Sequence, residues 1–271
     1  MSQEAQRNEM TSKKVVLELE AMDAVTVRRD VEWPASDGGT LTMDLYLPPG
    51  APHDALLPTV VVAAGYPDPG FERMLGCKFK EMGSTVSWGK LVATSGMAAV
   101  AYTNRQPEAD LHALLVHLRR NADGLGLDES RLGLWASSGN APLALSLLLR
   151  DASERLCCAA LCYPCTLDLD GSTGIADAAK TFGFANPCAG RFVDDLRSDL
   201  PLFVARAGRD QTPGLNEALD RFVAAAVTRN LPITFVNHPE GPHAFDLFHD
   251  SEETREIVRR VLGFLSFHLG R

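Results

Sequence analysis

A serine pair lies in residues 133–142, which read GLWASSGNAP and join an apolar segment to a run of small residues. A serine in such a strand-to-helix turn is held in a strained backbone conformation, with its hydroxyl exposed to attack a carbonyl carbon. Its neighbours two positions away must be small, because the strand and the helix approach each other closely there. The segment therefore indicates a nucleophilic serine and the chemistry of acyl transfer.

Two serines compete for this position. If Ser137 were the nucleophile, the large ring of Trp135 would stand two positions before it, where the turn tolerates little volume. If Ser138 is the nucleophile, Ala136 fills that place, and Gly139 offers the following backbone N–H to an oxyanion. We therefore predict Ser138 as the nucleophile. The structural alternative is that the serines only cap the following helix.

A serine hydroxyl needs a general base and an acid that orients this base. Asp210 follows the apolar segment 202–207, just beyond a break at Gly208. His243 lies in a loop rich in proline and glycine that follows the segment 233–238. A loop position lets the imidazole reach the nucleophile, so we predict Asp210 as the acid and His243 as the base.

Other acids and histidines remain open as alternatives. Asp168 or Asp170, after the preceding expected strand, could supply the acid instead of the residue named above. His238 lies at the end of an expected strand and is typical of a structural histidine, and His249 is a weaker alternative for the base.

The elements that must position these residues alternate between short β-rich runs and longer helical patterns. We expect strands at 24–33, 40–47, 59–64, 98–102, 131–136, 157–163, 202–207 and 233–238, and helices at 88–95, 108–125, 139–150, 215–229 and 252–267. This alternation predicts an α/β protein: a mostly parallel central sheet with helices on both faces, preceded by an N-terminal antiparallel hairpin.

The domain organisation follows from the same pattern. Residues 1–23 form an N-terminal arm, and residues 24–271 form a single domain with loop insertions at about 65–87 and 166–199. Both insertions lack a regular period and follow expected parallel strands, whose carboxyl ends are where ligands bind in α/β sheets. The functional site should lie beside them.

The first insertion is expected to form a lid over the site. Phe71, Met74, Phe79 and the following Trp88 are the predicted substrate-binding side chains, because large apolar groups are poorly placed in a solvated loop. The alternative is that these side chains only extend the core. The charged residues between them, including Lys80, are expected to form a solvated outer face.

At this point the chain resembles the α/β-hydrolase superfamily, and within it the dienelactone-hydrolase-like and related serine esterase branch. The resemblance spans about residues 25–268, and its motifs are VVVAAGYP at 60–67, GLWASSGNA at 133–141, ARAGRD at 205–210 and HPEGPHAF at 238–245. It implies the α/β-hydrolase fold, in which nucleophile, acid and histidine follow in this order along the chain. It also implies that the second oxyanion N–H is that of Tyr66.

The chain departs from this family in two respects. The pattern G-x-S-x-G has Ala136 and Asn140 at its glycine positions, so the elbow match is partial. Dienelactone hydrolases proper use a cysteine nucleophile, so their particular substrate does not carry over.

The 271-residue chain has the composition of a soluble globular protein, 45% apolar and 23% charged. Its formal charge of −9 repels phosphate backbones, and no apolar run approaches the length of a membrane span. Residues 1–19 contain no export signal, and the six cysteines do not form the spaced framework of a small secreted domain. We therefore expect a cytoplasmic protein with no nucleic-acid or membrane partner.

Motifs for metals and cofactors fail on spacing. Cys162 and Cys165 have C-x-x-C spacing, but no second pair or histidine stands at zinc spacing, so we interpret them as buried or cavity-lining thiols. Residues 83–91 do not match a phosphate-binding loop, and His112 and His117 are five positions apart on a helix and do not share a face. We expect neither a metal nor a cofactor.

The predicted function is that of a serine hydrolase that cleaves carboxylic esters of small acyl substrates through a Ser-His-Asp triad and an acyl-enzyme. Thioesterases, lactonases and peptidases use the same triad. The alternative class is a weakly active or non-catalytic ligand-binding protein with this fold, since a fold does not imply a function. The expected partner is a small-molecule ester, and the chain could form a homo-oligomer.

Overall fold

An eight-stranded sheet forms the centre of the computed structural model, which describes residues 11–52, 55–167 and 174–270. The strands are β1 (Thr26–Pro34), β2 (Thr40–Leu47), β3 (Leu57–Val62), β4 (Ala98–Tyr102), β5 (Leu127–Ser137), β6 (Cys158–Cys162), β7 (Leu202–Ala207) and β8 (Ile233–His238). Their order in the sheet is β1-β2-β4-β3-β5-β6-β7-β8. β1 and β2 form an antiparallel hairpin, β2 pairs antiparallel with β4, and all other neighbours are parallel. The predicted fold class is confirmed.

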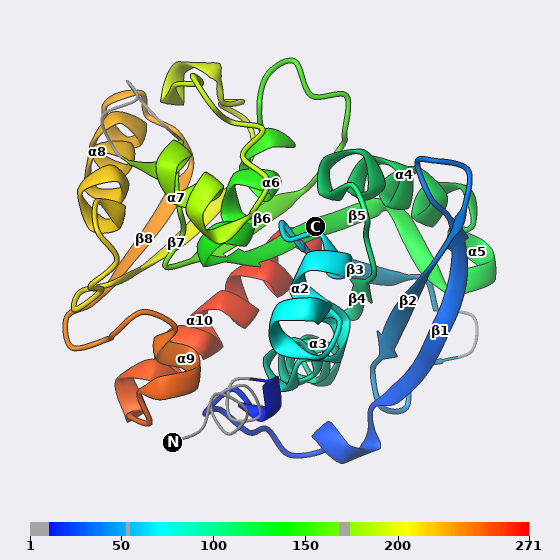
Figure 1. The fold of residues 1–271 in the computed structure, drawn as a ribbon. Coiled ribbons are helices and arrows are strands. Elements are labelled where there is room, and N and C mark those ends of the chain that lie inside the picture. Colours follow the sequence, from blue (N-terminus) through cyan, green and yellow to red (C-terminus); the bar gives the residue numbers. More distant parts are fainter. Residues whose placement is uncertain (1–10, 53–54, 168–173, 271) are drawn as a thin grey trace.

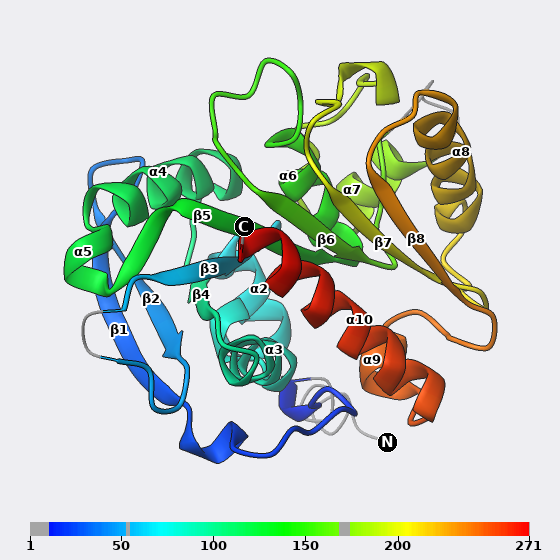
Figure 2. The same ribbon diagram turned by 180° about the vertical axis from the view of Figure 1, so that it is seen from behind.

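Helices cover both faces of this sheet (Figures 1 and 2). α3 (Gly83–Thr94) and α10 (Glu252–Leu269) lie on one face, and α4 (Pro107–Arg120), α6 (Ala141–Ser146) and α8 (Leu215–Thr228) lie on the other. Every residue of the inner strands β4 and β6 is accordingly buried. In the part of the chain that the structure describes, no helix is long and apolar enough to cross a membrane.

Two expected helices are shorter than the sequence pattern indicated. The expected helix 108–125 divides into α4 and α5 (Ala122–Leu125), because Asn121 donates a side-chain hydrogen bond to the carbonyl of His117 and ends the first helix. The expected helix 139–150 ends at Ser146, because the chain then forms an antiparallel bridge between Leu149 and Leu196. The expected strand 131–136 is longer and begins at Leu127.

The two insertions contain regular structure, so the prediction that they are irregular is wrong for much of their length. The first holds α2 (Asp68–Leu75), the 3₁₀ turn η2 (Phe79–Glu81) and the first turn of α3, and the described part of the second holds α7 (Ile175–Phe182) and η4 (Val193–Asp195). A proline in the first turn and a left-handed Gly76 at the C-terminus bound α2 within eight residues. The remaining short elements are η1 (Met22–Ala24), η3 (Ser138–Asn140) and α9 (Phe245–Phe248).

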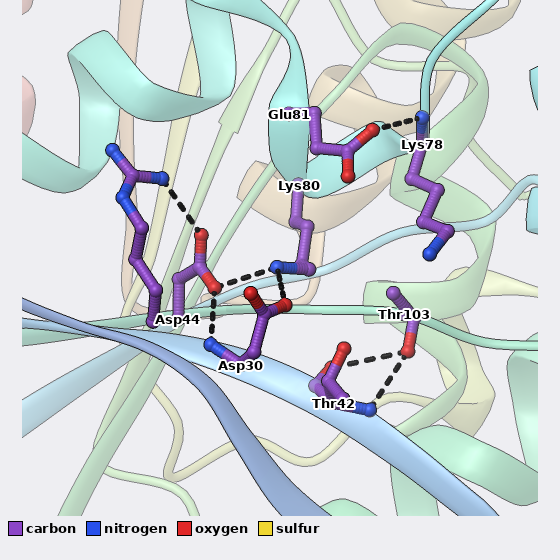
Figure 3. A network of polar contacts seen from close by, with 8 residues as sticks. Asp30, Thr42, Asp44, Lys78, Lys80, Glu81 and Thr103 are labelled. Carbon is purple, nitrogen blue, oxygen red and sulfur yellow. Dashed lines mark hydrogen bonds and ion pairs between the residues drawn. The ribbon is translucent and has the colours of Figure 1, made fainter.

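Lys80 corrects the expectation that the charges of the first insertion are solvated. Its side chain is only 3% exposed, and Nζ donates to Asp44 Oδ1 at 2.6 Å and to Asp30 Oδ1 at 2.8 Å (Figure 3). Burial by itself would lower the pKa of Lys80, but the hydrogen bonds to the two carboxylates outweigh it and raise this pKa. Since Asp30 and Asp44 belong to β1 and β2, this ion-pair network anchors the first insertion to the hairpin.

Candidate active site

The turn after β5 holds one serine in the left-handed conformation. Ser138 has φ +50°, whereas Ser137 is the last residue of β5 with an extended φ of −135°. A non-glycine residue at positive φ stores about 1–3 kcal/mol of strain, which the packed surroundings must hold in place. The surroundings are tight, because a Cβ added to Gly139 would come 2.7 Å from the ring of Phe184. The turn therefore presents the hydroxyl of Ser138, in the register that the sequence predicted.

A chain of two hydrogen bonds joins the three predicted triad residues. Ser138 Oγ lies 2.8 Å from His243 Nε2, and His243 Nδ1 lies 2.6 Å from Asp210 Oδ2. If Nδ1–H donates to the carboxylate, Nε2 is left to accept the proton of the serine hydroxyl. The structure thus brings together, from three separate loops, the residues that were predicted separately.

Asp210 is held as a carboxylate. Its side chain is fully buried, and burial alone would raise its pKa. The hydrogen bond and the charge of His243, together with the N–H of Thr212 at 2.9 Å, outweigh burial and lower the pKa below its usual value. A negative charge next to Nδ1 fixes the tautomer that leaves Nε2 free to act as a base.

Backbone hydrogen bonds join the loop that carries Asp210 to the loop that carries His243. Gly208 N–H donates to the carbonyl of His238 at 2.8 Å, and Arg209 N–H donates to the carbonyl of Gly241 at 2.9 Å. A Cβ added to Gly208 would come 2.6 Å from the carbonyl oxygen of Pro239, so only glycine allows this approach. The glycines of the two motifs therefore set the distance between acid and base.

The alternative residues lie elsewhere or cannot be placed. His238 is completely buried, and its Nε2 lies 2.8 Å from Thr254 Oγ1 on α10. His249 Nδ1 lies 3.2 Å from the same Nε2, so these two histidines contact each other near the N-terminus of α10. Asp168 and Asp170 lie outside the described residues.

Asn140, which departs from the family pattern, joins the loop after β3 to the turn after β5. Asn140 is buried, and its Oδ1 accepts the backbone N–H of Gly65 at 2.7 Å. A Cβ added to Gly65 would come 2.9 Å from the carbonyl oxygen of Gly139. Asn140 thus ties the loop that carries Tyr66 to the turn that carries Gly139. The N–H groups of these two residues remain the predicted oxyanion donors.

A second asparagine also fixes this loop and was missed from the sequence. Asn104, after β4, donates through Nδ2 to the carbonyl of Tyr66 at 3.1 Å, and its side chain is completely buried. Its backbone N–H donates to Asp68 Oδ2 at 2.8 Å, which also fixes the start of α2. Neither asparagine stands in a motif that identifies its role, because each acts across a long sequence separation.

A cavity of about 320 Å³ opens onto Ser138 and His243. The four predicted substrate-binding residues all line it: Phe71, Met74, Phe79 and Trp88. The sequence did not identify Trp135, Tyr163, Phe182 and Asp246, which also line it. A larger cavity of about 470 Å³ lies between residues 14–23 and α3, and contains none of the three triad residues.

The cysteines next to the site are unreactive thiols. Cys162 and Cys165 are buried, and all six cysteines of the chain are free. Burial raises the pKa of Cys165 to about 12 and also raises that of Cys162 well above its ordinary value. Cys165 contributes structurally instead, because its backbone N–H donates to the carbonyl of Ser138 at 3.1 Å.

Comparison with known proteins gives a fold and no sequence family. No family model matches the chain, and no curated protein matches it. Among solved structures, an α/β-hydrolase enzyme from the metagenome of Lake Arreo, Spain, has 18% identity and a TM-score of 0.69, over 99% of this chain and 88% of that one. A thermophilic esterase of Thermogutta terrifontis has 17% identity and a TM-score of 0.65, over 91% and 94%. A bacterial heroin esterase has 14% identity and a TM-score of 0.68, over 94% and 87%.

These similarities cover nearly the whole chain at low identity, so they establish the architecture rather than the activity. The sheet order, the strained serine after β5 and the positions of acid and histidine after β7 and β8 agree with that architecture. The chain therefore has the α/β-hydrolase fold.

Proposed function

We propose that this protein is a serine hydrolase that cleaves carboxylic esters with small acyl groups. The observation that carries the proposal is the hydrogen-bonded series Ser138–His243–Asp210, which begins at a serine in a strained left-handed turn. Two of the three structures compared above are esterases, which supports an ester as the substrate. The predicted dienelactone-hydrolase-like branch is a finer assignment that remains a prediction.

The proposed reaction passes through a covalent acyl-enzyme. Ser138 Oγ attacks the carbonyl carbon of the ester while His243 Nε2 takes the hydroxyl proton, and Asp210 stabilises the imidazolium that forms. The backbone N–H groups of Gly139 and Tyr66 hold the oxyanion. His243 then gives the proton to the leaving alkoxide, which departs as the alcohol. A water molecule then attacks the acyl carbonyl carbon while His243 takes its proton. The bond from this carbon to Ser138 Oγ breaks, His243 returns the proton to Oγ, and the acid leaves.

Covalent labelling tests this function. A fluorophosphonate reacts only with an activated serine, so the purified protein should gain the mass of one phosphonyl group and lose its turnover of nitrophenyl acetate. A ligand-binding protein with this fold would show neither the label nor the turnover, and that result would reject the hydrolase.

The role of Asn140 gives a prediction about the oxyanion loop. Replacing Asn140 with alanine leaves the buried N–H of Gly65 without its acceptor, which should lower the free energy of unfolding by about 1–3 kcal/mol. A misplaced Tyr66 N–H should also lower kcat on nitrophenyl acetate by about tenfold, with little change in KM. Urea unfolding and steady-state kinetics measure both effects. The control for kcat is Asn121→Ala, at an exposed position at the end of α4 that does not line the cavity. Unchanged kcat in the folded Asn140→Ala variant would contradict this role.

The apolar wall of the cavity predicts a preference for short acyl chains. Phe71 and Phe79 are both buried, with ring centroids 5.8 Å apart, and they come from the insertion that covers the cavity. Acetyl and butyryl esters should therefore react faster than dodecanoyl esters. Trimming either ring to alanine should shift the preference towards longer chains by about tenfold, since each change opens the wall.

Relative kcat/KM values for nitrophenyl acetate, butyrate and dodecanoate measure this shift. Phe192→Ala is the matched control, because Phe192 is an exposed ring that does not line the cavity. If the chain-length preference of the stable Phe71→Ala and Phe79→Ala variants is unchanged, these side chains only extend the core and the lid is rejected.

A further inference from the structure

One carboxylate lies in the wall of the cavity that opens onto Ser138. Asp246 is the second residue of α9, three positions after His243, and is only 1% exposed. Its Oδ1 accepts a hydrogen bond from Tyr163 Oη at 2.7 Å, and its Oδ2 accepts one from Trp88 Nε1 at 2.8 Å. The proposed reaction gives this carboxylate no task.

The carboxylate of Asp246 accepts hydrogen bonds from neutral side chains. Both donors are uncharged, and among the described residues no lysine or arginine lines this cavity. Burial raises the pKa of Asp246, and its two side-chain hydrogen bonds and the charge of His243 only partly oppose that rise. A buried carboxylate without a counter-cation is unfavourable, and a cation that enters the cavity would relieve this cost.

The rest of the wall also suits a cation. The rings of Trp88 and Trp135 lie with centroids 4.4 Å apart, and the ring of Tyr163 stands next to that of His243 with centroids 5.0 Å apart. Aromatic faces carry a negative potential that attracts ammonium groups, most strongly for tryptophan. The chain as a whole carries a formal charge of −9, which also favours the approach of cations.

We propose that this cavity binds the positively charged end of the ester, a quaternary or protonated ammonium group, between its aromatic walls and Asp246. The ester part of this inference rests on the proposed function, and the inference deepens it by naming the substrate class. A neutral alkyl group of the same shape would gain the contact with the rings but would leave the carboxylate unpaired. Between two groups of the same shape, the cavity therefore discriminates by charge.

Binding of choline and its uncharged isostere, 3,3-dimethylbutan-1-ol, tests the charge preference without any turnover. The signal is intrinsic fluorescence, because Trp88 and Trp135, two of the three tryptophans, line the cavity. We expect the native protein to bind choline about tenfold more tightly than the neutral alcohol, or better. Asp246→Asn should weaken choline binding by about tenfold and leave the binding of the alcohol unchanged.

The matched control is Asp123→Asn, which removes one negative charge from an exposed position on α5. It should change neither affinity, so a general effect of net charge would be recognised. Asp246→Asn can keep both hydrogen bonds, because its amide oxygen can accept from Trp88 and its amide N–H can donate to Tyr163 Oη. If this variant does not fold, the comparison of choline with the alcohol on the native protein still decides.

Two ester pairs determine which end of the substrate carries the charge. Butyrylcholine against 3,3-dimethylbutyl butyrate reports the alcohol side, and nitrophenyl 4-(trimethylammonio)butanoate against nitrophenyl 5,5-dimethylhexanoate reports the acyl side. A kcat/KM preference for the cation in one pair, lost in Asp246→Asn, supports the proposal and assigns the side.

Equal binding of choline and the alcohol by the native protein would overturn the proposal, as would full choline affinity in Asp246→Asn. If kcat/KM shows no preference for the cationic ester in either pair, the ester part of the proposal is overturned. Because the fluorescence titration needs no catalysis, absence of the fluorophosphonate label would reject the hydrolase function and leave the cation site standing.

Discussion

Replacement of Ser138 by alanine is expected to lower kcat on nitrophenyl acetate by about 10⁴-fold or more, and to abolish labelling by a fluorophosphonate. The reason is that Ser138 alone combines the left-handed turn with a hydrogen bond to His243. Ser137→Ala should keep most of the activity, because Ser137 lies in β5 with an extended backbone, although it also borders the cavity. The measurements are kcat for both variants and the mass of the labelled peptide.

The adjacent serine makes this a closely matched comparison. Both variants lose one hydroxyl, both positions touch the same cavity, and the two residues are neighbours in sequence. Thermal unfolding of both proteins checks that each is folded. A label on Ser137 or on Cys162, or a Ser138→Ala variant with substantial turnover, would remove Ser138 from the proposed role.

Strands were the most predictable elements of the fold. The bounds of β4, β7 and β8 agree with the expected ranges. β4 and β7 are covered on both faces, and such a strand reads as a short apolar run between polar turns. The short helices of the insertions were not predicted. α2 and α7 each have eight residues, so two turns of helix offer too few apolar positions for a period to be recognised.

In the candidate site, too, a local sequence pattern identifies some residues and not others. Ser138, Asp210 and His243 stand out locally, because each lies in a motif that follows a predicted strand end. Asn140 was not recognised, since its bond to Gly65 spans 75 positions and no local pattern records it. Lys80 was wrongly expected at the surface for the same reason: its partner Asp44 is 36 positions away, on another strand. Long-range pairing of buried polar groups therefore limits what one sequence can show.

Replacement of His243 by alanine should lower kcat by about 10⁴-fold and should lower the free energy of unfolding by less than His238→Ala does, because the buried carboxylate of Asp210 keeps the N–H of Thr212 as a partner. The imidazole of His243 is 34% exposed and lies at the mouth of the site, so its removal takes away the base without opening the core. His238→Ala should do the opposite. It leaves a cavity in the core and deprives the Thr254 hydroxyl of one of its two hydrogen-bond partners, which should cost about 2–4 kcal/mol of stability.

The pH dependence of stability separates the two histidines further. Burial lowers the pKa of His238 below its ordinary value and outweighs the attraction of Glu253. The unfolded chain therefore binds a proton at His238 more readily than the folded protein does, so this histidine makes stability fall as the pH drops below about 6.5. In His238→Ala this part of the acid sensitivity should disappear. The free energy of unfolding in urea should then differ less between pH 5 and pH 8 than it does in the native protein.

The two histidines thus give opposite expected results in one pair of experiments, nitrophenyl acetate kinetics and urea unfolding. His243→Ala should fold with a smaller loss of stability than His238→Ala and with almost no turnover, because the hydrogen-bonded series from Ser138 to Asp210 is interrupted at its centre. His238→Ala should be less stable but, where it is folded, should keep kcat within a few-fold. The reverse ranking in purified, folded variants would move the general base to His238, and with it the geometry of the whole site.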